Sequence, residues 1–234
     1  MIVYGGSLSP YVRKVMVFGA EKGIELAIKN AGMGRSFPEF EEASPFGKMP
    51  GFRDGDFAIS DSSAIVAYLE AIRPEPALIP AEPKARARTI WFDEFADTIL
   101  RGTGRTIFFN RVVCGLIGRE GDLAAAAKAE ADEMPGLFDY LERVIPDSGF
   151  LVEDRLTLAD ISVVSPLINL SYCGVGADAE RHPRTAGFVA AMRARPSFAR
   201  MIAMDERILG GRGRSAATKQ SSGTGIWIAS LRSQ

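Results

Sequence analysis

The first part of the chain alternates between short apolar runs and apolar positions at helical spacing. Residues 2–4 and 24–29 are predicted as strands because they form short, bounded apolar stretches. The first strand ends at Gly5 and Gly6. Apolar residues at helical spacing follow it, at Val12, Val15 and Met16. The pattern therefore predicts a strand, a helix and a second strand at the start of the chain.

The same alternation continues as far as residue 73. The further elements expected are a short irregular helix at residues 37–43, strands at 51–53 and 57–59, and a helix with an apolar face from 65 to 72. The turn Asp54-Gly55-Asp56 between the last two strands is a strong hairpin signal. Residues 1–73 are thus predicted to form an α/β domain of order β-α-β-α-β-β-α.

Four prolines, Pro74, Pro76, Pro80 and Pro83, separate this region from the rest. Since their locked φ angles suit neither a helix interior nor a central strand, residues 74–83 are predicted as an extended linker. Apolar positions at helical spacing follow, which predicts an all-helical domain at residues 84–210.

Three positions in the helical domain are expected to disturb their helices. Gly102 and Gly104 should weaken or bend one helix, and Pro135 should kink or break another. Residues 211–234 lack periodicity and are rich in Gly and Ser, so they are predicted to be a disordered tail.

Composition narrows the class of protein. The chain has 234 residues, of which 47% are hydrophobic and 24% are charged, as is typical of a soluble globular protein. The net charge of −1 and the lack of a basic face argue against a nucleic-acid partner. No apolar run approaches the roughly 18 residues of a membrane-spanning helix, and the start does not resemble a secretory signal, so no membrane partner is expected.

The cysteine and histidine content argues against a structural disulfide and against a metal centre. Cys114 and Cys173 form no CxxC motif, so no structural disulfide is expected and a cytoplasmic location fits. His182 is the single histidine, which predicts a structural role and no metal centre. Asp160 follows Thr157 by three residues, and a capping box at a helix start explains this acid better than catalysis does.

The run Ser9-Pro10-Tyr11 is the main candidate for chemistry. Ser9 is predicted to cap the helix that follows the first strand, with Pro10 as its first residue. The first amides of a helix have no internal partner and carry the positive end of the macrodipole, so an anion beside Ser9 would be stabilised. A thiol with an ordinary pKa of about 8.5 can ionise much more readily in such a position. By itself, however, the run is better explained as an ordinary helix start, because capping serines followed by proline are common there.

Taken together, several motifs resemble the glutathione S-transferase family over residues 1 to about 209. Ser9-Pro10-Tyr11 looks like the (Ser/Cys)-Pro-(Phe/Tyr) signature of the serine-type and cysteine-type members, which include bacterial ones. Residues 46–50, with the sequence Phe-Gly-Lys-Met-Pro, look like the PFGKxP loop with its cis-proline, and Asp61-Ser62 like the acidic-Ser pair. Residues 157–160 match the capping motif of the second domain. The resemblance implies a thioredoxin-like N-terminal domain, an all-α C-terminal domain and a homodimer.

The resemblance also implies a site for glutathione as co-substrate. Its cysteinyl backbone would pair with Met49 beside the cis Pro50, Asp61 and Ser62 would bind its γ-glutamyl end, and Lys48 would reach its glycyl carboxylate. Because serine is a poor base, the Ser9 hydroxyl is expected to donate a hydrogen bond to the sulfur, so that the glutathione thiolate is the nucleophile. Tyr4 and Ser7 are alternative donors. Serine in place of cysteine puts thiol-transfer activity in doubt.

The second substrate is expected to be a small apolar electrophile placed by the helical domain. The candidate residues are Tyr11, Phe108, Phe109, Asn110 and Tyr172. Isomerisation, dehalogenation or ether cleavage at the same site remains an alternative to conjugation. So does a binding protein that keeps the fold without turnover, although such a protein would need no such set of site residues.

Overall fold

The computed structural model describes the backbone of residues 1–32 and 34–223, and the side chains of these residues as far as Gly210. The N-terminal domain contains a four-stranded sheet of order β2-β1-β3-β4. Its strands are β1 (Ile2–Tyr4), β2 (Ala27–Lys29), β3 (Gly51–Asp54) and β4 (Phe57–Ser60). β1 runs parallel to β2 and antiparallel to β3, and β3 and β4 form the expected hairpin.

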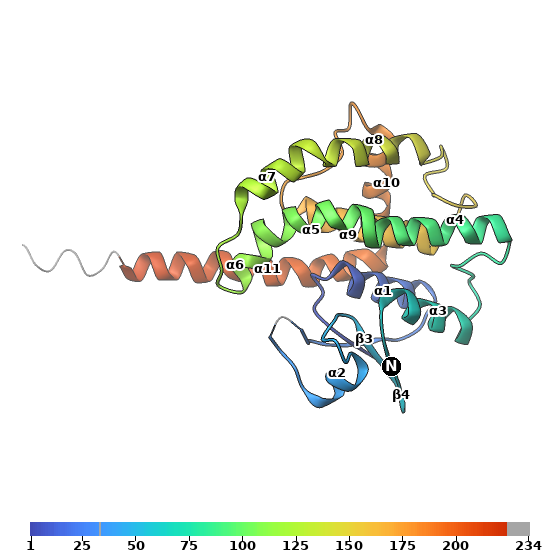
Figure 1. Ribbon diagram of the computed structural model, residues 1–234, viewed down its shortest axis with the longest axis horizontal. Coiled ribbons are helices and arrows are strands. Elements are labelled where there is room, and N and C mark those ends of the chain that lie inside the picture. The colour runs from blue at the N-terminus through green and yellow to red at the C-terminus, as the bar shows by residue number, and fades with distance from the viewer. Residues whose placement is uncertain (33, 224–234) are drawn as a thin grey trace, which may run out of the picture.

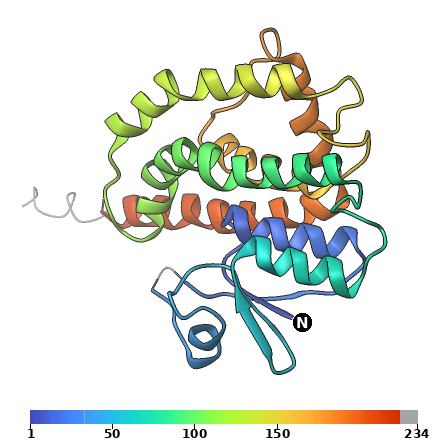
Figure 2. The ribbon, with the colours of Figure 1, turned by 45° about the vertical axis from the view of Figure 1, so that its right-hand side comes forward.

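Helices cover both faces of this sheet. α1 (Pro10–Glu21) and α3 (Ser62–Ile72) pack on the face that is turned toward the helical domain, whereas α2 (Pro38–Ala43) lies on the other face (Figure 1; Figure 2). The element order β1-α1-β2-α2-β3-β4-α3 confirms the predicted β-α-β-α-β-β-α pattern. The second strand is shorter than expected, because the chain leaving α1 first turns back, with the Ile24 amide donating to the Gly19 carbonyl.

No helix or strand is assigned to residues 73–82, and the chain from Pro83 onward is helical. A long helical rod begins the second domain. It consists of α4 (Pro83–Glu94), the π-helix η1 (Phe95–Leu100), α5 (Arg101–Phe108), the π-helix η2 (Phe109–Val113) and α6 (Cys114–Leu116). The rod continues through Gly102 and Gly104, which were expected to weaken or bend it. Both glycines lie in the α-helical part between the two π-helical segments.

The remaining helices surround α9. They are α7 (Leu123–Asp132), α8 (Met134–Val144), α9 (Leu158–Ser171), α10 (Pro183–Ala194) and α11 (Pro196–Gly223). The break between α7 and α8 lies at Glu133, and Pro135 falls in the first turn of α8, where the missing amide costs nothing. α9 is buried along nearly its whole length because it packs against α1, α4, α5 and α10.

The start of α9 has the predicted capping box. The Asp160 carboxylate accepts hydrogen bonds from the Thr157 and Leu151 amides, both at 2.8 Å. Its side chain is fully buried, and burial raises the pKa of Asp160 to about 6. Asp160 therefore has a structural explanation, as expected. His182 is also buried, and its Nε2 lies 2.8 Å from an oxygen of Asp139.

The two domains are joined through charged groups that the apolar pattern did not reveal. Arg13 and Lys14 on α1 are both fully buried. The Arg13 guanidinium donates to the Ser165 carbonyl and the Asn169 side chain, both at 2.6 Å, and contacts the Asp205 carboxylate at 2.5 Å. All three acceptors belong to helices of the second domain, so α1 acts as the connection between the domains.

The last helix differs from the expectation for the tail. α11 extends to Gly223, so residues 211–223, predicted to be disordered, continue a helix. Extending a helix that packing has already nucleated is much easier than starting one, and this stretch contains good helix formers such as Ala and Lys. Residues 224–234 of the predicted tail lie outside the described residues.

Two further findings concern membrane-spanning helices and the state of the cysteines. Within residues 1–32 and 34–223, no helix has both the length and the apolar character needed to cross a membrane. Cys114 and Cys173 are both free, and Cys114 is buried.

Candidate functional site

Strand pairing brings three loops to one end of the sheet. Tyr4 is paired with Gly51, and Gly51 is paired with Ser60 on its other side. The segments that leave the sheet from this row are residues 5–9, 49–50 and 61–62, and they contain Ser9, Met49, Pro50, Asp61 and Ser62. The register therefore gathers the residues expected to bind glutathione.

Ser9 lies where the first of these loops becomes α1. It has extended backbone angles, its Oγ accepts a hydrogen bond from the Val12 amide at 3.4 Å, and Pro10 follows as the first helical residue. The side chain is partly exposed, and no acidic residue lies in the first turn of α1. As a cap, the Ser9 oxygen uses a lone pair and keeps its hydroxyl hydrogen available. The positive end of α1 is thus open to an anion.

Met49 lies directly against this junction. A Cβ atom on Gly5 would come within 2.5 Å of the Val12 side chain, so glycine is needed where this loop lies against α1, and the Met49 Cβ lies at a contact distance of 3.4 Å from the same position. The Met49-Pro50 bond is cis. Among the described residues, neither the amide nor the carbonyl of Met49 has a hydrogen-bond partner. The loop therefore offers unpaired backbone groups close to Gly5, in the segment that leads to Ser9.

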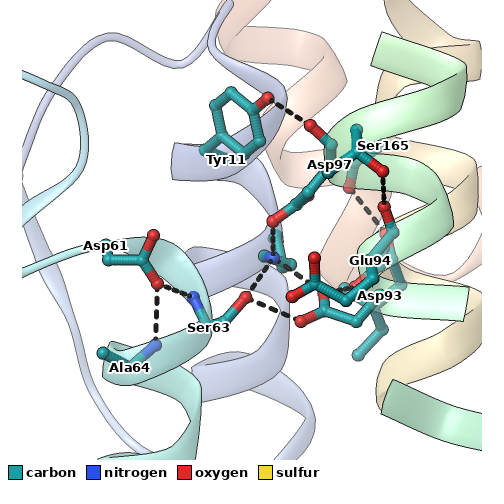
Figure 3. Close-up of polar contacts among 12 residues, drawn as sticks. Tyr11, Asp61, Ser63, Ala64, Asp93, Glu94, Asp97 and Ser165 are labelled. Atoms are coloured by element: carbon teal, nitrogen blue, oxygen red, sulfur yellow. Dashed lines mark hydrogen bonds and ion pairs between the residues drawn. The ribbon is translucent and has the colours of Figure 1, made fainter. Parts of the chain in front are cut away.

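Asp61 begins α3 in a conformation that is rare for a residue with a side chain. Its φ angle is 80°, and one carboxylate oxygen accepts the amides of Ser63 and Ala64 at 2.9 and 3.0 Å (Figure 3). The other oxygen has no partner within the described part of the chain, and the residue is exposed. Ser62 is buried at the first position of α3. Since such backbone outliers cluster at functional sites, Asp61 is a candidate ligand-binding group.

Lys48 and Phe46 occupy the exposed part of the loop before Pro50. The Lys48 carbonyl accepts the Ser44 hydroxyl at 2.6 Å, which holds the loop, while the Lys48 ammonium is exposed to solvent. Phe46 is 87% exposed, an unusual state for a large apolar side chain.

The alternative thiol donors have different surroundings. The Tyr4 side chain is buried on the α2 face of the sheet, where its ring packs against Phe37 and Phe40. The Ser7 hydroxyl is buried and has no hydrogen-bond partner among the described residues. Of the three candidate donors, Ser9 is the one whose side chain is partly exposed at the start of α1.

Tyr11 lies between the start of α1 and the helical rod. Its hydroxyl donates to the Asp97 carbonyl at 3.3 Å, and the Arg101 guanidinium lies 5.6 Å from its ring centroid. Burial raises the pKa of Tyr11 to about 12, so it remains protonated at neutral pH. A small pocket here is lined by Pro10, Tyr11, Lys14, Ala96, Asp97, Arg101, Ser162 and Pro166.

The other expected electrophile-binding residues have mostly structural contacts. Phe108 is buried, and Asn110 holds a loop by accepting the Asp122 amide at 2.9 Å. Tyr172 donates to Asp205 at 2.9 Å, and burial raises the pKa of its hydroxyl. Phe109 is partly exposed, with the Arg105 guanidinium 5.4 Å from its ring centroid.

A charged cluster behind the site was not predicted. The Lys14 ammonium lies 2.7 Å from both Asp93 and Asp97 and donates to the Ser63 hydroxyl at 3.2 Å (Figure 3). Lys14 thereby ties α1 to α3 and to the rod. Burial raises the pKa of Asp97, and the Lys14 charge opposes this effect. A sequence signal did exist, since acids at 93 and 97 and arginines at 101 and 105 recur every four residues.

The site contains no obvious metal-binding group. Over the residues that the structure describes, no three or more His, Cys, Asp or Glu side chains are arranged to hold a metal ion. The chemistry available here is therefore that of a helix start, hydroxyl groups and an unpaired backbone edge acting on a bound molecule.

Comparisons with known proteins agree on one family. Residues 3–77 match the family profile "Glutathione S-transferase, N-terminal domain", and residues 116–204 match "Glutathione S-transferase, C-terminal domain". A glutathione S-transferase of Hyoscyamus muticus is 27% identical over 209 residues, covering 86% of this chain and 97% of that protein.

Solved structures give the same result for the fold. A glutathione S-transferase from Rhodospirillum rubrum superposes with a TM-score of 0.78 at 26% identity, covering 86% of this chain and 90% of that one. Glutathione S-transferase I from maize, solved in complex with an atrazine glutathione conjugate, has a TM-score of 0.75 at 21% identity. That comparison covers 87% of this chain and 96% of the maize chain.

Proposed function

Because the chain belongs to the glutathione S-transferase family, we propose that Ser9 is the residue that stabilises the glutathione thiolate. The protein is a glutathione transferase, and glutathione is its co-substrate. The observation that carries the role of Ser9 is its hydrogen bonding: its oxygen accepts the Val12 amide while its hydrogen remains free to donate. A sulfur beside it would also lie at the positive end of α1.

The reaction follows from this arrangement. The Ser9 hydroxyl donates to the sulfur and favours its ionised form, and the thiol proton leaves to solvent. Ser9 has no base beside it that would make it a nucleophile, so the thiolate attacks the electrophile. Isomerisation, dehalogenation and ether cleavage would begin from the same thiolate, and the bound electrophile decides among them.

The rest of glutathione is proposed to lie along the end of the sheet. Its cysteinyl backbone would pair antiparallel with the free amide and carbonyl of Met49, as an added strand does at a sheet edge. Pro50, the residue that follows this edge, is buried. Lys48, on the exposed loop, would reach the glycyl carboxylate as a point charge.

The γ-glutamyl end is proposed to bind at the start of α3. The free oxygen of Asp61 would accept its ammonium, while the Ser62 amide and hydroxyl would donate to its carboxylate. The two carboxylate oxygens of Asp61 thus have different roles: one caps α3, and the other would bind the ammonium of glutathione.

We expect Asp61→Asn to weaken glutathione binding by about 10- to 100-fold, the loss of one charge-assisted hydrogen bond. Asparagine caps helices as well as aspartate does and tolerates positive φ, so this variant removes the charge and keeps the fold. Calorimetric titration with glutathione measures the effect, and Asp56→Asn in the exposed hairpin turn is the matched control. An unchanged affinity, or a loss confined to kcat, would contradict this role.

The protein is further proposed to be a homodimer. Two exposed apolar side chains of the rod, Ile90 and Ile99, support this proposal, as does Phe46 on the glutathione-binding loop. We expect Phe46→Ser to weaken self-association at least about tenfold, because Phe46 would lose its burial against the second copy. Light scattering across a dilution series measures this, with Leu123→Ser, 61% exposed on α7, as control. A monomeric wild type at micromolar concentration would refute the dimer.

A cytoplasmic location and a role in detoxification are also proposed. Two free cysteines, one of them only partly buried, are compatible with a reducing compartment. Fractionation of cells that express the chain checks the location.

A further inference from the structure

We propose, on the premise that Ser9 holds the glutathione thiolate, that the electrophile carries a carboxylate, which Arg101 and Arg105 bind beside Tyr11. This differs from the small apolar electrophile expected from the sequence. It concerns the second substrate of the site and assigns it a chemical class.

The two arginines form a pair on one face of α5. They are four residues apart, which places them one turn apart on the same side of the helix. Neither guanidinium forms an ion pair with any acid in the described part of the chain. The side chains that the structure does not describe, those of Met33 and residues 211–234, include no Asp or Glu. The pair therefore has unsatisfied capacity for an anion.

Residues 93, 97, 101 and 105 form one series of charged positions along the rod, and its two acids differ from its two arginines. Asp93 and Asp97 precede the arginines at the same spacing, and both carboxylates are bound by Lys14 at 2.7 Å. Both acids of this series are thus ion-paired inside the protein, by one lysine that they share, whereas neither arginine is paired with an acid of the described residues.

Arg101 lies close to the start of α1. Its guanidinium lies 5.6 Å from the Tyr11 ring centroid, and it lines the same pocket as Pro10 and Tyr11, the two residues that follow Ser9. The π-helix η1 comes immediately before Arg101, and π-helical turns inside α-helices are frequent at functional sites. Arg105 follows one turn further along α5, with its guanidinium 5.4 Å from the ring centroid of Phe109, another residue expected at the electrophile site.

Chemistry favours a carboxylate as the bound group. A guanidinium presents a planar fork of donors that matches the two oxygens of a carboxylate, and the Arg101 guanidinium lies over the Tyr11 ring. An electrophile bound in this way would have its reactive carbon turned toward the thiolate.

A matched pair of electrophiles tests the inference. 1-Chloro-2,4-dinitrobenzene is neutral, and 4-chloro-3,5-dinitrobenzoate is a close relative that carries a carboxylate. In both, the thiolate attacks the carbon that bears chlorine, a C–S bond forms, and chloride leaves with the electron pair of the C–Cl bond. The ratio of the two kcat/KM values, each divided by its uncatalysed rate constant, measures the preference for the carboxylate.

We expect the wild type to favour the benzoate, and Arg101→Gln and Arg105→Gln each to lower the ratio by about 10-fold or more, as for a lost charge-assisted hydrogen bond. Arg101→Lys should retain part of the preference because it keeps the charge. Arg200→Gln, at an exposed position of α11, is the control and should leave the ratio unchanged. A wild-type ratio near one, or arginine variants with the wild-type ratio, would overturn the proposal.

A binding measurement separates this inference from the role of Ser9. The glutathione conjugates of the two electrophiles are titrated calorimetrically into wild type and Arg101→Gln, which requires no turnover. Tighter binding of the carboxylated conjugate, lost in Arg101→Gln, supports the arginine site even if Ser9→Ala proves fully active. Equal binding of both conjugates by the wild type refutes it, whatever the outcome for Ser9.

Discussion

Replacing Ser9 by alanine is expected to lower kcat/KM for glutathione conjugation by about 100- to 1,000-fold, the usual effect of removing one preorganised donor to a reacting anion. The hydroxyl hydrogen, which the cap at Val12 does not use, would no longer stabilise the sulfur. The pKa of the thiol of bound glutathione should rise, because its ionised form loses this hydrogen bond. Ultraviolet absorbance of the thiolate against pH, together with conjugation of a neutral dinitrobenzene, measures both effects.

Two further variants keep this result interpretable. Ser9→Ala also removes a helix cap, at a cost of about 1 kcal/mol in stability, so its unfolding must be measured in parallel. Ser9→Thr keeps both the cap and the donor and should restore much of the activity. Ser7→Ala alters the neighbouring buried hydroxyl and tests the alternative donor directly. Wild-type turnover and thiolate formation in Ser9→Ala would reduce Ser9 to a cap and shift attention to Ser7 or Tyr4.

The second large effect concerns stability. Arg13→Met is expected to lower the free energy of unfolding by about 3–5 kcal/mol, because it leaves the fully buried Asp205 without its cationic partner. Tyr172 alone would then donate to that carboxylate, and the acceptors at Ser165 and Asn169 would lose their donor. Urea unfolding followed by circular dichroism measures the change.

The molecule supplies a matched control for this variant. Arg195 also connects the second domain to α1, through Glu21 at 2.8 Å, but its side chain is 33% exposed. Solvent screening limits such a pair, so Arg195→Met should cost about 1 kcal/mol or less. Combining Arg13→Met with Asp205→Leu should restore part of the loss, since no unpaired charge remains buried. Equal costs for Arg13→Met and Arg195→Met would show that burial of the pair is unimportant.

Local patterns were sufficient for much of this protein. The alternation of apolar runs and helical spacing in the first domain predicted every strand and helix there, because each element buries one face and the turns carry their own signals. Thr157 and Asp160 predicted a helix start for a similar reason, since a capping box involves neighbours in sequence. The helix continuing beyond residue 210 was missed because propagation from a packed helix is decided outside the stretch itself.

Charged residues of α1 show where local reasoning fails. By composition, Arg13 and Lys14 belong on a solvated face, as lysine and arginine are seldom buried unless they are paired. Their partners Asp93 and Asp205 are more than 70 residues away in sequence, so only the packing of α9, α11 and the rod on α1 shows that the pairs form. Tyr172 was predicted to lie at the electrophile site without this information, and the structure shows in addition that its hydroxyl donates to Asp205.

The sequence by itself determined the two-domain architecture, the helix cap at Ser9 and the motifs that resemble the glutathione S-transferase family. Each of these depends on residues that are close together in the chain. Only the tertiary structure decided that Gly5 lets its loop lie against Val12 of α1, that Lys14 pairs with both acids of the rod, and that Arg101 lies over Tyr11. The physical reason is that burial and charge pairing across domains depend on which surfaces meet. The spacing of residues along one segment carries no information about the distant segment that packs against it.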